Sequence, residues 1–309
     1  MKQVDKYIFF FLSLMLLPNI LFATHYKIAV RAHKGIDYAI KYWQPTVDVI
    51  AKKIPEHTFS LLPIISLKEV TQRTGKGNFQ FVLTNPSSFV EIKELYDAEN
   101  LVTLNNKRAN MAQSRFGSVI FTHVRHEDIL SIHDLEGKTL MAVTESAFGG
   151  WRVAWQEMLE QGFDPKNKLK KLMFTKSQTH PDVVMAVRDG IADAGVVRTD
   201  VLERMEASGK IDLRYFRIIG NKDIRNFPFF LSTKLYPEWA FAAMKSVSPE
   251  LKKKVKNVLL EISDKSLAAK SGNYIGWIPS LDYSSVRSLM LKLKVGPFSF
   301  LKNRNGNTQ

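Results

Sequence analysis

The chain has 309 residues, 45% of them hydrophobic, and its 44 lysines and arginines against 30 acidic residues give a formal net charge of +14. This length suits one large domain or two medium-sized lobes, and the composition excludes a disordered or low-complexity protein. The sequence contains no cysteine, which excludes disulfides, thiol nucleophiles and a lipid-anchored bacterial lipoprotein.

The first 23 residues have the three parts of a secretory signal. Lys2 and Lys6 form a basic start, an apolar run follows over residues 8–23, and Ala23 is a small residue suited to cleavage. Because the run is shorter than the roughly 20 residues that span a bilayer comfortably, we expect cleavage after Ala23 rather than an uncleaved anchor. The protein is therefore predicted to be periplasmic, and residues 301–309 to form a polar tail.

The predicted export limits the partners that the positive net charge can indicate. Nucleic acid is the usual partner of a basic chain, but an exported protein rarely meets it, so no nucleic-acid binding is expected. Residues 251–261 (LKKKVKNVLLE) alternate lysines with an apolar stripe, which is typical of a solvated helix face. A positive field would also speed the capture of a small anionic solute, which is the partner we predict.

Residues 24–115 alternate between strand and helix patterns. Pro45 is expected to open the first helix at its first turn. Ser66 and Glu69 have capping-box spacing before a second helix, and a third follows the sequence Thr84-Asn85-Pro86-Ser87-Ser88. The predicted strands are 26–30, 58–64 and 79–83.

The same alternation continues to about residue 220. Pro181 lies in the first turn of one predicted helix, and Thr199 is expected to cap another. Beyond residue 225 the pattern becomes mainly helical, with Pro237 and Pro249 each expected to start a helix and Ser248 to cap the second. The predicted strands of this part are 118–122, 139–143, 169–174, 191–197 and 217–220.

Neither residues 24–115 nor the mainly helical residues 226–300 have enough elements to form a domain alone. We therefore expect residues 226–300 to return and complete lobe 1 (24–115), leaving lobe 2 at 116–225 with two hinge crossings. The predicted fold is α/β and two-lobed, with a mostly parallel sheet flanked by helices in each lobe.

Several strand-to-helix junctions carry polar or small residues. Helices after parallel strands begin at the cleft edge of a sheet, and their N-termini present free N–H groups and a positive dipole end that favour anions. Glycines let the backbone approach a ligand closely. Each junction alone can be a plain helix cap, but their recurrence predicts an anion site. The junctions are 84–88, 146–150, 178–180 and 198–200.

An enzyme is the less favoured alternative. His123 and His126 are three residues apart, but the sequence offers them no third ligand, and a catalytic zinc needs three. No phosphate-binding GxxxxGK[ST] loop and no GxSxG nucleophile motif occurs. We therefore expect no catalysis, no metal and no cofactor.

The order of motifs resembles the periplasmic binding proteins of the phosphate, phosphite and phosphonate type. The markers in the first half are Trp43-Gln44-Pro45, Thr84–Ser88, Asp134-Leu135-Glu136-Gly137-Lys138 and Ser146–Gly150. The chain is also similar to the periplasmic sensing domains of tetrathionate-type sensor kinases, through Phe230–Thr233, Leu235–Trp239, Gly276–Pro279 and Leu281–Tyr283.

This resemblance implies a type II binding fold in which a ligand lies between two lobes at helix N-termini. It further implies a monomer that works with an ABC permease or a membrane sensor kinase. Together with the junctions and the aromatic residues near them, it gives a set of predicted ligand-binding residues. They are Lys34, Trp43, Thr84, Asn85, Ser87, Ser88, Ser146, Phe148, Gly149, Gly150, Gln178, His180, Arg198 and Thr199.

Two departures from these families bear on function. Phosphonate binders have a richer run of hydroxyls where this chain has Ala147-Phe148-Gly149, which favours a larger or softer anion such as a sulfur oxyanion. The sensor kinases continue into a membrane helix and a kinase, whereas this sequence ends at Gln309. We expect capture of the anion for ABC import or, as the alternative, a freestanding sensory protein that signals through a separate membrane kinase or cyclase.

Overall fold

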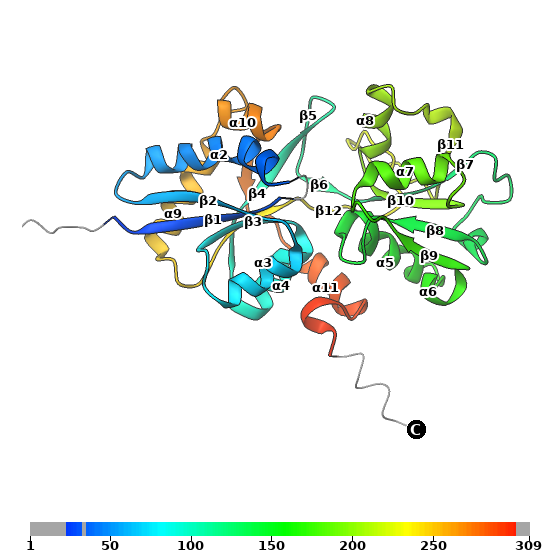
Figure 1. Cartoon of the computed structure of the whole chain (residues 1–309), viewed down its shortest axis with the longest axis horizontal. Helices are drawn as coiled ribbons and strands as arrows, with labels where there is room; N and C mark the ends of the chain where they lie inside the picture. The colour runs from blue at the N-terminus through cyan, green and yellow to red at the C-terminus, as the bar shows by residue number, and fades with distance from the viewer. Residues whose placement is uncertain (1–22, 33–34, 301–309) are drawn as a thin grey trace, which may run out of the picture.

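A computed structural model describes residues 23–32 and 35–300 of the protein. Two sheets, each flanked by helices, lie side by side and are joined by the short strands β6 and β12 (Figure 1). The predicted two-lobed α/β architecture is confirmed. Apart from Ala23, the predicted signal segment lies outside the described residues, as do Lys34 and the tail.

The first lobe is built on a mixed sheet with the strand order β14-β4-β13-β3-β1-β2, and β5 pairs with β4. β1 runs parallel to β2 and β3, whereas β13 runs antiparallel to β3 and β4. β1, β3 and β4 therefore point the same way, and their carboxyl ends meet at one edge. The strands are β1 (His25–Arg31), β2 (Thr58–Ile64), β3 (Phe81–Thr84), β4 (Glu99–Arg108), β5 (Met111–Gln113), β13 (Ala240–Ala243) and β14 (Tyr274–Pro279).

Helices cover both faces of this sheet. One apolar cluster, which includes Trp43, Ile50 and Phe241, packs α2, α9 and α10 against one face. The other face lies against α3 and α4. The helices are α2 (Ile36–Lys53), α3 (Leu67–Gly75), α4 (Pro86–Tyr96), α9 (Pro249–Leu260) and α10 (Leu267–Gly272).

The second lobe has a mixed sheet with the order β11-β7-β10-β8-β9. β8 pairs parallel with β9 and β10, and β7 pairs antiparallel with β10 and β11. Both sheets are thus mixed rather than mostly parallel, because each contains chain reversals that sequence periodicity does not reveal. The elements are β7 (Ser118–His123), β8 (Thr139–Ala142), α5 (Val153–Glu160), α6 (Pro165–Lys168), β9 (Lys171–Phe174), α7 (His180–Arg188), β10 (Ala194–Arg198), α8 (Val201–Ala207) and β11 (Phe216–Ile219).

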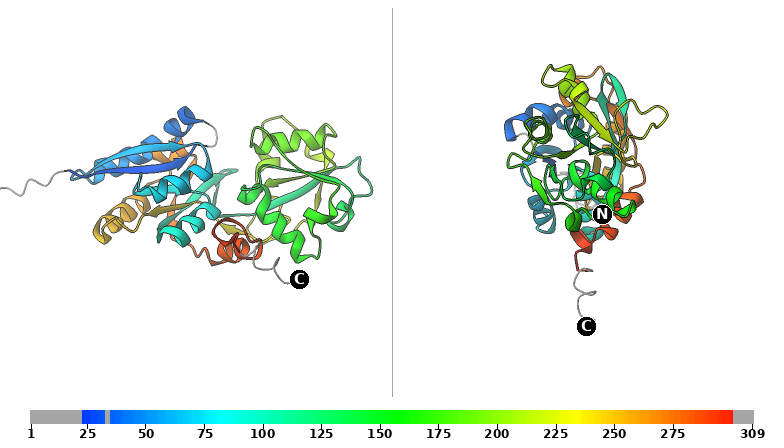
Figure 2. Two further views of the ribbon diagram at one scale, coloured as in Figure 1. Left: turned by 60° about the horizontal axis from the view of Figure 1, so that its bottom comes forward. Right: turned by 90° about the vertical axis from the view of Figure 1, so that its right-hand side faces the viewer.

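Two crossings and a C-terminal helix connect the lobes. β6 (Arg115–Phe116) pairs antiparallel with β12 (Tyr236–Pro237). Helix α11 (Ser284–Lys292) lies beneath them, in contact with α4 of the first lobe and α5 of the second (Figures 1 and 2). Strands before residue 114 and after 239 belong to the first sheet, and strands between 118 and 219 to the second. The lobe limits at 115/116 and 225/226 stay a prediction.

Two prolines do not open the helices expected of them. Helix α2 begins at Ile36, and Pro45 lies inside it. The helix continues past the missing N–H because its buried face, which includes Trp43 and Val47, supplies the stability. Pro237 belongs to β12 and is followed by β13, not by a helix. A two-residue strand accommodates proline because it needs few donors.

The predicted helix caps have different outcomes. Ser66 and Ser248 accept hydrogen bonds from the backbone N–H groups of Glu69 and Leu251, as predicted. Thr199 does not cap α8, whose N-cap residue is Asp200. In residues 23–32 and 35–300, no helix combines the length and apolarity that a bilayer span requires.

Candidate functional site

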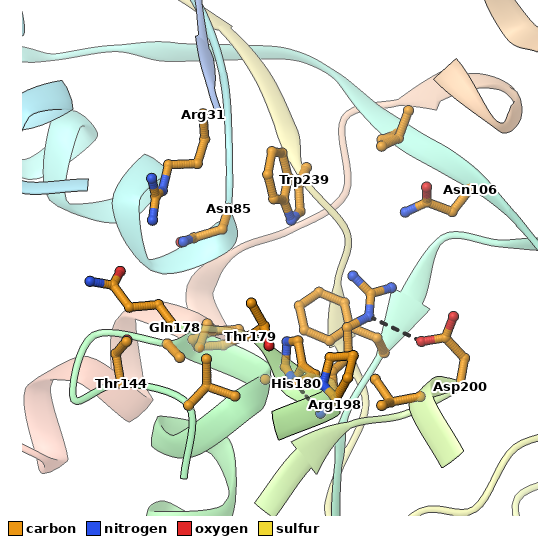
Figure 3. A pocket seen from close by; sticks show the side chains of 18 of the residues that line it. Arg31, Asn85, Asn106, Thr144, Gln178, Thr179, His180, Arg198, Asp200 and Trp239 are labelled. Carbon is orange, nitrogen blue, oxygen red and sulfur yellow. Dashed lines mark hydrogen bonds and ion pairs between the residues drawn. The ribbon is translucent and has the colours of Figure 1, made fainter. Parts of the chain in front are cut away.

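A cavity of about 320 Å³ lies between the lobes. Figure 3 shows Arg31, Asn85, Asn106 and Trp239 reaching it from the first lobe, opposite side chains of the second lobe such as Gln178. This volume falls within the range of small-molecule pockets.

Eight of the predicted ligand-binding residues line this cavity. The second lobe contributes most of them, through the loop before α5 and the start of α7. Five others do not line it: Thr84, Ser87, Ser88, Gly150 and Thr199. Lys34 lies outside the described residues. The residues that line the cavity are Trp43, Asn85, Ser146, Phe148, Gly149, Gln178, His180 and Arg198.

The serines after β3 belong to the start of α4 and do not face the cavity. Asn85 caps α4 by accepting hydrogen bonds from the Ser88 N–H at 2.9 Å and the Ser87 hydroxyl at 3.0 Å. Both serines are buried behind this turn. The Thr199 hydroxyl also has a partner within the protein, because it accepts a hydrogen bond from the Gly117 N–H at 3.3 Å. None of the predicted hydroxyl groups in these two turns lines the cavity; Asn85 and Arg198 are the predicted residues of the turns that do.

Gly149 and Gly150 serve close packing between protein segments. A Cβ on Gly149 would lie 2.8 Å from the Phe116 ring, and one on Gly150 would lie 2.6 Å from Cγ2 of Val143. Neither position has room for a side chain. Gly149 still lines the cavity, while Gly150 packs against the protein behind it.

Three arginines at the cavity each end a strand. Arg31 is the last residue of β1, Arg108 of β4 and Arg198 of β10. Ligands of α/β sheets bind beyond the carboxyl ends of strands, and these positions place guanidinium groups there. The prediction included Arg198 but missed Arg31, although the end of its predicted strand was a usable signal. Arg108 could not be found in this way, because β4 was not recognised as a strand.

Arg31 reaches the cavity without a carboxylate beside it. The side chain is half-buried, and burial lowers its pKa from the ordinary value. No hydrogen bond or ion pair links its guanidinium to another residue in the described part of the chain. A partly desolvated charge without a partner is costly for the folded protein. Arg31 is therefore positioned to gain from an incoming anion.

The other arginines form a network that joins the two lobes. Nε of Arg108 lies 3.2 Å from the Asp200 carboxylate, and Nε of Arg204 lies 2.8 Å from the same oxygen. Arg198 pairs with Glu238 and lies over the Phe116 ring, 4.1 Å from its centroid. Burial acts to lower the pKa of Arg198, but Glu238 and Asp200 outweigh it and hold that pKa above its ordinary value. The lobes are thus already linked electrostatically.

The local charge balance follows from these groups. Four arginines (Arg31, Arg108, Arg198 and Arg204) against the two carboxylates of Asp200 and Glu238 leave a net charge of +2. In the figure, Arg31 lies on one side of the cavity, and Arg198 with Asp200 on the other (Figure 3). Such a site suits a dianion with charge at both ends.

Aromatic rings supply the remaining wall. The rings of Tyr38 and Tyr42 stack with their centroids 4.9 Å apart, and burial and the neighbouring Tyr38 raise the pKa of Tyr42 to about 12. Tyr42 therefore stays neutral and can donate its hydroxyl proton. Trp43 and Trp239 line the same side, and Phe148 lies opposite. Nδ1 of His180 accepts from the Arg198 backbone N–H at 3.3 Å, so its proton is on Nε2 when the ring is neutral.

Residues 37–283 match a family model described as the periplasmic substrate-binding protein of a phosphonate ABC transporter. The chain belongs to this family. The family is periplasmic, binds small anionic ligands and is not enzymatic. The resemblance predicted from the motifs is therefore confirmed, and the protein is a solute-binding domain of the phosphonate-binding type.

A curated relative is a sensor kinase. The chain is 32% identical over 235 residues to the tetrathionate sensor histidine kinase TtrS of Salmonella typhimurium. The match covers 76% of this chain and 39% of that protein. The chain thus spans about two fifths of the length of this relative.

Solved structures share the fold at low sequence identity. A Xanthomonas citri protein bound to ATP has a TM-score of 0.67 at 17% identity, over 91% of this chain and 99% of that chain. PhnD1 of Prochlorococcus marinus in complex with methylphosphonate has a TM-score of 0.66 at 15% identity, over 88% and 98%. Both similarities concern the fold alone.

Proposed function

We propose that this protein captures a doubly charged sulfur oxyanion of the tetrathionate type between its two lobes. The observation that carries the proposal is Arg31, whose partly buried guanidinium faces the cavity with no partner among the described residues. An anionic group of the ligand would supply the missing countercharge. Such a charge-assisted pair is among the stronger contacts available to a ligand.

The shape of the charge supports an anion with two ends. Tetrathionate has two sulfonate groups joined by a pair of sulfur atoms, so its charge is split between its ends and its middle is polarisable. One end would meet Arg31 and the other the cluster of Arg108 and Arg198. The aromatic wall, which includes Trp239, would contact the sulfur atoms between them.

The identity to the tetrathionate sensor kinase, at 32%, favours a sensory role. We infer that ligand-induced closure of the lobes is read by a membrane-bound kinase or cyclase and that the protein performs no chemistry on the ligand. Export through the predicted signal at residues 1–23 and a monomeric state belong to this proposal.

Phosphonate uptake through an ABC permease is the second candidate, and the family match over residues 37–283 favours it. A phosphonate has one compact charged group and could engage Arg31 alone. It would leave the opposite arginines with only their internal carboxylates, Asp200 and Glu238.

A thermal-shift panel tests the ligand class. Tetrathionate, thiosulfate, sulfite, sulfate, phosphate, methylphosphonate and a neutral amino acid are compared at equal ionic strength. A ligand present at 100 times its Kd raises the stability of the folded state by about 2.7 kcal/mol. We expect the largest shift with tetrathionate. A larger shift with methylphosphonate would favour the uptake function, and a shift only with the amino acid would contradict anion binding.

A further inference from the structure

Glu238 is a buried carboxylate next to the cavity that does not itself line it. Its side chain is fully buried, between the hinge strand β12 and strand β13. The carboxylate pairs with the Arg198 guanidinium of the second lobe and accepts from the Asn106 side-chain amide of the first at 2.6 Å. Both of these partners line the cavity. One residue at the hinge therefore holds a polar group in each wall of the pocket.

The backbone fixes this carboxylate in place. The N–H of Glu238 donates to the Ser114 carbonyl at 2.9 Å, and its own carbonyl accepts from the Tyr283 hydroxyl at 2.5 Å. The Trp239 N–H donates to the carboxylate at 3.1 Å. Glu238 is thus tied to the segment before β6 and to the residue that precedes α11, which are parts of the connection between the lobes.

We propose that Glu238, by pairing with Arg198, limits the positive charge of the pocket, so that it sets the affinity and charge preference of the site. This inference rests on the proposed function. This role differs from a purely structural one in the sign of the effect that Glu238 has on anion binding. A structural residue supports folding and binding together, whereas a charge-limiting residue supports folding and opposes the binding of anions.

The reason lies in the ion pair of Arg198 and Glu238. The Glu238→Gln variant keeps the size of the side chain but leaves Arg198 without its closest countercharge. A buried charge that loses its partner destabilises the free protein. A bound anion then supplies the missing countercharge, so its binding becomes more favourable. Because one negative charge next to the pocket is removed, we expect the affinity for an anion to rise about tenfold.

Calorimetric titration of tetrathionate into wild type and Glu238→Gln tests this expectation. The variant should have a lower melting temperature without ligand, a Kd about tenfold lower and a steeper loss of affinity with added salt. Glu157→Gln is the matched control, because Glu157 is also a buried carboxylate paired with a cation, Lys222 at 2.7 Å, but this cation does not line the cavity as Arg198 does. The control should lose stability and keep the wild-type Kd. An unchanged or weaker affinity in Glu238→Gln would overturn the proposal.

A second measurement separates this inference from the proposed function. Stability is compared among wild type, Glu238→Gln, Arg198→Met and the double variant, without ligand. If Glu238 compensates Arg198, adding Arg198→Met should recover at least half of the melting temperature lost in Glu238→Gln. Strictly additive losses would refute the compensation, whatever the ligand is. A wild type that binds none of the panel anions would instead refute the proposed function, and the stability comparison would still decide the pairing.

Discussion

We expect Arg31 to contribute to binding and to lower the stability of the free protein. Most charged side chains at the cavity have a carboxylate within reach, as Arg108 has Asp200, but none lies beside Arg31 in the described chain. Its burial lowers its pKa, which reflects the unfavourable removal of a charge from water. Replacing a side chain that destabilises the free protein and stabilises the complex should lower the affinity for the ligand without lowering the stability of the free protein.

Replacing Arg31 by methionine tests this opposition. We expect the affinity for tetrathionate to fall at least about thirtyfold, in line with the cost of removing one partner of a buried charge pair. The free protein should keep its stability or gain some, because an unpaired buried charge is removed. Titration calorimetry and urea unfolding measure the two effects. Lys41→Met, on the exposed side of α2, is the control and should change neither. A destabilised free protein with unchanged affinity would contradict this role.

Sequence reasoning found some of the cavity residues and misplaced others for an identifiable reason. Polar residues after predicted strands led to Asn85, Gln178 and His180, all of which line the cavity. The same rule selected Ser87 and Ser88, because composition does not reveal which side chains of a turn face the cavity and which are buried behind it. Arg31 and Arg108 were not predicted, because the rule selects helix N-termini and these two residues end strands.

At the scale of elements, the loop before α5 is shaped by packing. Residues 148–152 form a π-helical turn that places Gly150 against Val143 and His180. The sequence predicted that both glycines let the backbone approach a ligand; Gly149 does line the cavity, whereas Gly150 packs against neighbouring side chains. Individual strands were predicted well where they alternate apolar residues, as in β1 and β2. The long strand β4 was missed because it mixes buried and exposed positions without regular alternation.

The substitution Gly150→Ala should therefore act on stability. The new Cβ would lie 2.6 Å from Cγ2 and 2.9 Å from Cβ of Val143. We expect overpacking of about 1–3 kcal/mol in the free energy of unfolding, measured by urea denaturation. Ser146→Ala in the same loop is the control and should stay within about 0.5 kcal/mol of wild type. A stable Gly150→Ala protein would show that the loop has more room than the structure indicates.

Glu160 links three elements, and the stabilisation from these contacts depends on pH. It accepts hydrogen bonds from Lys234 of the hinge segment at 2.7 Å, from Gln156 of α5 at 2.9 Å and from Lys292 of α11 at 3.3 Å. The Lys234 hydrogen bond is the main cause that lowers the pKa of Glu160 to about 2. Because this pKa lies below the ordinary value of 4.5, the stabilisation is complete above about pH 5 and is lost as the pH falls toward 2.

The Glu160→Gln variant tests this dependence. Near pH 6 it should be less stable than wild type by about 1 kcal/mol, a small value because the site is largely exposed to solvent. The difference in melting temperature between the two proteins should shrink as the pH is lowered from 5 toward 2. A difference that stays constant over this range would mean that these partners do not lower the pKa of Glu160.

For the whole molecule, the lobes share more than two crossing strands. One apolar cluster includes Phe89 of α4, Trp155 of α5 and Met290 of α11, so the core continues from one lobe to the other beneath the hinge. Sequence could suggest two lobes from incomplete halves, but it could not show that α11 packs on both (Figure 2). In the proposed function, the lobes close about this shared base, and Arg31 and Arg198, which line the cavity from opposite lobes, approach the same anion.

The most direct test of the central claim is calorimetric titration of tetrathionate into the wild-type protein at low and at physiological salt. We predict one binding site per chain and an affinity that weakens as salt is added, since the pocket charge of +2 attracts the dianion. The absence of binding by tetrathionate and by every other anion of the panel, or binding that does not depend on salt, would contradict the account.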